Sequence, residues 1–194
     1  LCGLTEGQTT ADFSKQNLGP IDCKIIAAEF GFRGFIGAIA RLTLSGNMIT
    51  GSRDEGGMFG TNFNYDTDLS GLISLCDALP TLKNPIELDL SNCGLSVNGI
   101  NPLAKAMAAG AALNSIVLDG NLLTGTQRQG YGYAETTCDV QIDGFKALCD
   151  ALAPSQIREI SLKSCWLGPQ AVVLLADAIK FMGAINLLTL GSTG

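Results

Sequence analysis

The chain has 194 residues, of which 46% are hydrophobic and only 15% are charged, and its formal net charge is −6 with no histidine. This acidic balance argues against a nucleic-acid partner, because phosphate contacts need clustered Lys and Arg side chains. The lack of histidine removes the usual metal sites and the common nucleophile–base pairs, so we expect no metal, no cofactor and no catalytic residue. No apolar run approaches the roughly 18 residues that span a bilayer, so we expect no membrane span.

Residues 1–8 show no hydrophobic periodicity and are predicted to form an amino-terminal arm, and a single domain is expected over residues 9–194. Helices are indicated where apolar residues recur at intervals of three and four, which places them on one helical face. The first stripe begins just after Pro20, at the expected first turn. The five predicted stripes are Cys23, Ile26, Ala27 and Phe30; Leu72, Leu75, Cys76 and Leu79; Ile100, Leu103, Ala104 and Met107; Phe145, Leu148, Cys149 and Leu152; and Val172, Leu175, Ala176 and Ile179.

A second pattern precedes each stripe and is clearest in residues 116–125, where Ile116, Leu118 and Leu123 surround a polar Asn121. Three further copies lie at Leu42, Leu44, Asn47 and Ile49; at Leu88, Leu90, Cys93 and Leu95; and at Ile160, Leu162, Cys165 and Leu167. A degenerate copy opens the chain at Ala11, Phe13, Gln16 and Leu18, and a truncated one closes it at Leu188 and Leu190.

This is the pattern L-x-x-L-x-L-x-x-N/C-x-L, and the chain resembles the leucine-rich repeat family, in its strand–helix type similar to ribonuclease inhibitor. The resemblance implies an α/β solenoid, or horseshoe, of five repeats plus a partial sixth. Its parallel strands would line the concave face and its helices the convex face. Each helix cannot bury its stripe alone, so stacking on its neighbours would stabilise the fold.

The spacing of the strands alternates between long and short. Two steps span 28 residues, whereas the other two span 46 and 44. The extra residues form two insertions, at about 52–66 and 126–141, and each begins just after a Thr-Gly pair. We interpret the long-plus-short unit as the product of a tandem duplication.

Both insertions leave the carboxyl end of a strand, so we expect them to lie side by side at one edge of the domain. Aromatic and Arg side chains on Gly-rich loops above a rigid scaffold are typical of a binding surface. The candidate contacts are Phe59, Phe63, Tyr65, Arg128, Tyr131 and Tyr133. The same residues also fit two hairpins whose aromatic side chains cover the edge of the domain itself. Four carboxylates beside helix starts are expected to act as N-caps, namely Asp66, Asp68, Asp139 and Asp143.

Two further surfaces can be predicted. The residues that alternate with the strand leucines are polar and mildly acidic, among them Glu87, Asp89 and Glu159, which fits either a surface for a basic partner or a plain solvated face. The helix faces predicted to point outward carry little charge, and those of the last repeat are the most apolar. A strand edge at that end would need cover from more chain, a second copy or a partner subunit, and Leu174 and Phe181 are the candidate contacts there.

Seven cysteines raise the question of disulfides. Five of them occupy repeat positions, and equivalent positions two repeats apart are on the order of 20 Å apart. A disulfide needs Cα atoms within about 7 Å, so we expect buried free thiols and an intracellular, reducing compartment. The five are Cys23, Cys76, Cys93, Cys149 and Cys165, whereas Cys2 and Cys138 lie outside the pattern.

The sequence therefore predicts a non-enzymatic protein–protein interaction module, a scaffold or accessory subunit within a multisubunit assembly. One alternative is the ligand-reading fragment of a longer sensor or signalling protein. Another is an enzyme whose site lies between the insertions, which would need a closed pocket with two carboxylates within about 10 Å of each other.

Overall fold

A computed structural model describes residues 3–5, 7–30, 39–54, 63–82, 84–129 and 135–191. Its elements are β1 (Thr10–Asp12), α1 (Pro20–Phe30), β2 (Arg41–Thr43), β3 (Arg53–Asp54), β4 (Phe63–Asn64), α2 (Ser70–Ala78), the 3-10 helix η1 (Leu79–Thr81), β5 (Ile86–Asp89), α3 (Asn101–Ala108), β6 (Leu113–Val117), β7 (Gln127–Gln129), β8 (Glu135–Thr137), α4 (Asp143–Leu152), β9 (Glu159–Ser161), α5 (Pro169–Ile179) and β10 (Leu187–Thr189). No helix in these ranges is long and apolar enough to cross a membrane.

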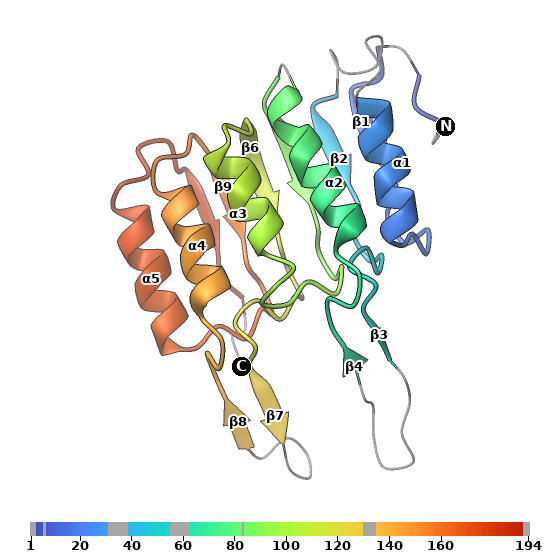
Figure 1. Cartoon of the computed structure of the whole chain (residues 1–194). Coiled ribbons are helices and arrows are strands. Elements are labelled where there is room, and N and C mark those ends of the chain that lie inside the picture. The colour runs from blue at the N-terminus through green and yellow to red at the C-terminus, as the bar shows by residue number, and fades with distance from the viewer. Residues whose placement is uncertain are drawn as a thin grey trace.

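Six strands form one parallel sheet in the order β1-β2-β5-β6-β9-β10, and the other four form the antiparallel hairpins β3–β4 and β7–β8. Helices α1 to α5 lie side by side in chain order over one face of the sheet (Figure 1). The predicted α/β class with parallel strands is therefore confirmed.

The strand register follows from the leucine pattern. Pairing places one predicted position of every strand in a single row across the sheet, namely Ala11, Leu42, Leu88, Ile116, Ile160 and Leu188. The first five are at most 2% exposed and face the helices, while Leu188, in the edge strand β10, is half-buried. Because side chains alternate along a strand, the residues on either side of this row point to the opposite face. A shift of one residue would expose the whole row, so the register is strongly fixed.

Buried asparagines join neighbouring strand segments at the Asn/Cys position of the pattern. Asn121 is 2% exposed, and its Oδ1 accepts hydrogen bonds from the N–H groups of Cys93 (3.1 Å) and Leu95 (3.0 Å). Its Nδ2 donates to the carbonyls of Leu90 and Leu118, both at 2.8 Å. The side chain thus satisfies four backbone groups that would otherwise be buried without a partner.

In the three other full copies of the pattern, the same position is filled by one Asn and two Cys residues. Asn47 makes the equivalent four bonds, to the N–H groups of Gln16 and Leu18 and to the carbonyls of Phe13 and Leu44. Cys93 and Cys165 instead donate their thiols to one carbonyl of the preceding segment, that of Leu44 (3.1 Å) and that of Leu118 (3.2 Å). Either side chain therefore links a segment to its predecessor.

The predicted helix stripes are confirmed in α1 to α4, where all but the half-buried Ala27 are buried against the sheet. In α5 the prediction is wrong by about one position. Leu175 is buried, but Ala171 and Ala178 accompany it, while Val172 and Ala176 are exposed and Ile179 is half-buried. The helix is apolar on almost every side, so its spacing fits more than one stripe.

The exposed positions of α5 also have a specific cause. The equivalent position is Ile100, just before α3, which α4 covers so closely that a Cβ on Gly144 would lie 2.9 Å from its Cγ2. No further helix of the described chain lies over α5 on the corresponding side, so Val172 is left 40% exposed.

Two glycines allow helices to meet at their amino ends. A Cβ on Gly71, in the first turn of α2, would lie 2.0 Å from the carbonyl oxygen of Pro20 at the start of α1. A Cβ on Gly144, in the first turn of α4, would lie 2.3 Å from the carbonyl oxygen of Val97, just before α3. Any larger side chain would force these helix starts apart.

Candidate functional site

Both hairpins extend beyond the same end of the sheet (Figure 1). Hydroxyl groups tie the root of each one to the segment that follows the next strand of the sheet. Thr50 and Ser52 donate to the carbonyl oxygen of Gly94 at 3.0 and 2.8 Å, and Thr126 donates to that of Trp166 at 2.7 Å. The insertions are therefore anchored on the domain at their roots.

Two carboxylates at the ends of the insertions bind backbone N–H groups at helix starts, but each does so at the helix after its own: Asp139 caps α5, and Asp66 binds the turn that leads into α3. Asp66 precedes α2, yet it accepts backbone N–H bonds from residues 96, 98 and 99 before α3, at 3.2, 3.1 and 2.8 Å. Asp139 precedes α4 and accepts N–H bonds from Gly168, Gln170 and Ala171 at the start of α5, at 2.9, 2.9 and 3.1 Å. Both aspartates have a positive φ, 54° and 56°. This conformation is uncommon outside glycine, although Asp tolerates it better than most residues.

Each carboxylate lies near the amino end of the following helix, where the helix dipole favours a negative charge. Burial raises the pKa of Asp66 above its usual value, against the opposing effect of its three N–H donors. Asp68 differs, because it is exposed and accepts from Ser70 N at 2.9 Å in its own helix α2, and hydrogen bonds from Ser70 lower its pKa. Asp143 lies exposed in the first turn of α4. Asp66 and Asp139 are thus occupied in holding backbone groups.

The predicted insertion contacts are only partly visible. The rings of Phe63 and Tyr65 pack together with their centroids 4.5 Å apart and a tilt of 45°. Phe63 is half-buried and Tyr65 is 40% exposed, so the pair covers part of the edge and also presents an aromatic face. Arg128 lies in β7, but its side chain is outside the described part of the structure, as are Phe59, Tyr131 and Tyr133.

The two candidates at the end of the sheet lie apart from the hairpin pair in the chain and in the fold. Leu174, in α5, is half-buried and packs against the core. Phe181 follows α5 and is 75% exposed. The structure therefore unites Phe63 with Tyr65 but does not join them to Leu174 or Phe181 in one site.

The face of the sheet opposite the helices carries a shallow polar depression of about 260 Å³. Its lining residues are Arg41, Thr43, Glu87, Leu88, Asp89, Ser115, Val117 and Glu159. Arg41 Nε donates to Glu87 at 2.7 Å, and the Ser91 hydroxyl donates to Asp89 at 2.5 Å. Beside the depression, Asp119 accepts from the Ser161 hydroxyl at 2.7 Å. Hydrogen bonds therefore orient several polar side chains of this face, namely those of Arg41, Glu87, Asp89 and Asp119.

A second hollow lies between α3 and α4 on the helix side, with a volume of about 1130 Å³. Sequence reasoning missed it. The available signal was a row of alanines on the facing helices at intervals of four, Ala104 and Ala108 in α3 and Ala147 and Ala151 in α4. Such a row also fits tight helix packing, which is why it did not predict a groove.

The buried thiols have low chemical reactivity. All six described cysteines are free, and five of them are buried, as predicted. Burial raises the pKa of Cys23, Cys76, Cys93, Cys149 and Cys165 to about 12, so these thiols stay protonated at neutral pH. Since the thiolate is the nucleophile and the metal ligand, these residues are poorly suited to either role. Within the described ranges, His, Cys, Asp and Glu residues form no group of three that could hold a metal ion.

No protein-family model matches this sequence, and a search of curated proteins finds no match. The function is therefore inferred from the residues and the surfaces that they form.

Proposed function

We propose that this chain is a non-enzymatic protein-interaction module, built as a leucine-rich repeat solenoid, that serves as a scaffold or accessory subunit of a larger assembly. The observation that carries the proposal is the face of the six-stranded sheet that no helix of the described chain covers. That face offers a partner several strands of fixed side chains at once.

The repeat architecture is supported by contacts that recur along the chain. The single row of core residues across the strands, the Asn47 and Asn121 bridges and the Asp66 and Asp139 caps each link one strand–helix segment to the next. Nearest-neighbour links of this kind are how a solenoid gains its stability. They also make the sheet a rigid support for a binding surface.

The sheet face favours a protein that presents Lys and Arg side chains. Glu87, Asp89, Asp119 and Glu159 lie on or beside the depression, and Arg41 is paired with Glu87 there. The chain as a whole is also acidic, so its electrostatic field attracts basic partners over a distance and accelerates their association. Because hydrogen bonds already orient several of these side chains, a partner loses little affinity to ordering them.

A binding role also suits the groups that might otherwise suggest chemistry. The five buried thiols are held protonated, and the carboxylates of Asp66 and Asp139 are committed to backbone N–H groups. Neither set is placed to attack a substrate or to move a proton. The paired ring surface of Phe63 and Tyr65 at the hairpin edge would extend the contact area beyond the sheet.

The test is a calorimetric titration of the chain with an oligolysine peptide and, in parallel, with an oligoglutamate peptide. We expect oligolysine to bind saturably and in a salt-sensitive way, and oligoglutamate not to bind. Glu159→Lys should weaken it by about tenfold or more, because this residue lies exposed on the sheet face. Asp77→Lys is the matched control, since Asp77 lies exposed on α2 in the helix layer and the change in net charge is the same.

Equal weakening by the two substitutions would mean that only the net charge matters, and the sheet face would lose its assigned role. Absence of saturable oligolysine binding would also contradict the proposal for this face.

A further inference from the structure

The groove between α3 and α4 has a clear geometric origin. The two helices touch at their amino ends, where Gly144 meets the carbonyl of Val97. The groove is lined from Asn101 onward on α3 but only from Ala147 onward on α4, and it continues past the helix ends along residues 110–114 and 154–158. The first turn of α4 thus touches the segment before α3, and the space between the helices is open beyond this contact.

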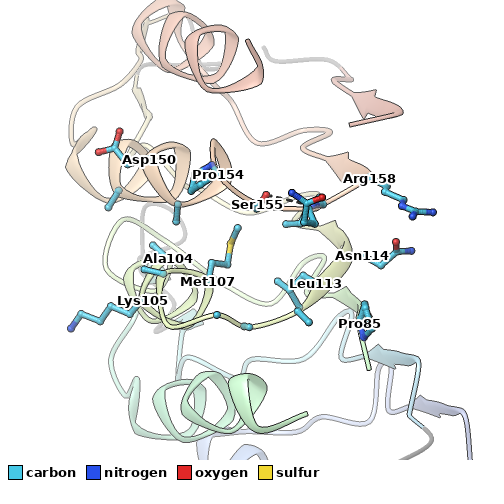
Figure 2. Close-up of a pocket in the computed structure, with 18 of the residues that line it drawn as sticks. Pro85, Ala104, Lys105, Met107, Leu113, Asn114, Asp150, Pro154, Ser155 and Arg158 are labelled. Atoms are coloured by element: carbon cyan, nitrogen blue, oxygen red, sulfur yellow. Dashed lines mark hydrogen bonds between the residues drawn. The ribbon is translucent and has the colours of Figure 1, made fainter. Parts of the chain in front are cut away.

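Small apolar side chains make up much of the helix walls of the groove. Ala104 and Ala108 face it from α3, and Ala147 and Ala151 face it from α4. Figure 2 shows Met107 extending from α3 into the space between the helices, and Leu113 lying deeper toward the sheet. Both of these are almost fully buried. Small walls let a guest backbone approach closely, and the flexible thioether of Met107 can adjust to its shape.

The ends of the groove carry positive charge. Lys105 and Asp150 lie at one end and Arg158 at the other (Figure 2). Asp150 is paired with Lys146 at 2.7 Å, so its charge is already balanced. Neither Lys105 nor Arg158 forms an ion pair with any residue in the described ranges. In a chain of net charge −6, the groove is therefore a local positive site with an apolar floor.

We infer that this groove binds an amphipathic helix of a partner protein, with the apolar stripe of that helix on the alanine walls and its acidic residues beside Lys105 and Arg158. This adds a second contact surface, on the side of the molecule opposite the sheet face. The eight residues of α3 give a wall about 12 Å long, or roughly two turns of a docked helix. Two turns supply three or four apolar anchors at the i, i+3, i+4 and i+7 positions.

A helix fits better than a small molecule because the groove is open along one side. Small ligands bind where most of their surface becomes buried, whereas a helix needs cover on one face only. The acidic ends follow from charge complementarity, since a basic or neutral helix would leave both cations without partners.

The test is a display selection on the intact chain, with a library of helical peptides whose apolar stripe and flanking residues are varied. Enriched peptides are then measured by fluorescence anisotropy. We expect enrichment of Asp and Glu near both ends of an apolar stripe. Ala147→Trp, which fills the groove from an exposed position, should weaken binding by at least about tenfold. Lys105→Glu and Arg158→Glu should each weaken it about three- to tenfold.

Lys24→Glu is the matched control, because Lys24 is an exposed lysine on α1 that does not line the groove. Unchanged binding to Lys24→Glu completes the expected result. Failure to enrich any helix, equal binding to Ala147→Trp, or a preference for basic ends would overturn the inference. A rise in Tm on addition of laurate, together with no binding of any selected helix, would also overturn the inference in favour of a small acidic amphiphile. Loss of oligolysine binding on the sheet face leaves these outcomes unchanged, so the two proposals fail separately.

Discussion

Replacing Asp139 with alanine tests whether the insertions hold the fold together. The carboxylate accepts three N–H bonds at 2.9, 2.9 and 3.1 Å from the first turn of α5, and two of these bonds are buried. Loss of an ordinary N-cap costs about 0.5–2 kcal/mol, and a buried donor left without a partner costs about 1–3 kcal/mol. We therefore expect Asp139→Ala to lower the free energy of unfolding by about 3 kcal/mol. For a domain of this size, that corresponds to a fall in Tm of about 6–12 °C.

The measurement is urea and thermal unfolding at pH 7, followed by circular dichroism. Asp143→Ala serves as the control, because Asp143 is an exposed carboxylate four residues away in the first turn of α4. Its loss should change the stability by about 0.5 kcal/mol or less. If Asp139→Ala were no more destabilising than Asp143→Ala, the cross-segment cap would have no energetic role and the reasoning would fail.

Three further predictions follow from buried contacts. Gly71→Ala should destabilise the fold by about 2 kcal/mol or more, because its Cβ would lie 2.0 Å from a backbone oxygen, whereas Gly183→Ala, with open space around it, should be nearly neutral. Asn121→Ala should lower the free energy of unfolding in urea by about 3 kcal/mol or more, because four buried hydrogen bonds are lost. Asn98→Ala is the control, since Asn98 is exposed. A loss below about 1 kcal/mol for Asn121→Ala would contradict the bridging role. Burial raises the pKa of five thiols from 9.0 to about 12. The folded state therefore holds these protons more tightly than the unfolded state, and the resulting stability is complete below pH 9 and is lost as the pH rises toward 12. The free energy of unfolding should fall by up to about 1.4 kcal/mol per thiol and pH unit. A free energy of unfolding that does not change between pH 9 and 11 would argue against this. So would alkylation, in the native chain at pH 8, of any described thiol other than that of Cys138.

The parts of the fold that the sequence predicts are those set by periodic burial. Leu42, Leu88 and Ile116 were aligned from the spacing alone, and the sheet pairs them in that register. The Asn/Cys position was equally visible, because a polar residue recurring inside a leucine pattern must satisfy backbone groups. Periodicity fails at α5, where apolar residues on nearly every side leave the phase of Val172 and Ala176 undetermined.

The candidate surfaces were predicted less well, because they depend on contacts between segments. The capping role of Asp66 and Asp139 could be read from their place beside helix starts, but their reach to the following helix depends on how the segments stack. The groove beside Met107 arises from the divergence of two helices, which no local spacing encodes. The polar sheet face was predicted residue by residue, since alternation alone places Glu87 and Glu159 there.

The caps have a mechanical consequence. Asp66 fastens the β3–β4 root to the start of α3, and Asp139 fastens the β7–β8 root to α5, whereas Asn121 joins the α3 and α4 segments near the sheet. In the helix layer, α3 and α4 meet at Gly144, and the groove lies between them beyond this contact. We therefore expect bending to be concentrated in the helix layer at this groove, with Gly144 as the pivot, while the Asn121 bridge keeps the two segments joined at the sheet. A helix seated in the groove would act as a strut and stiffen the molecule against bending.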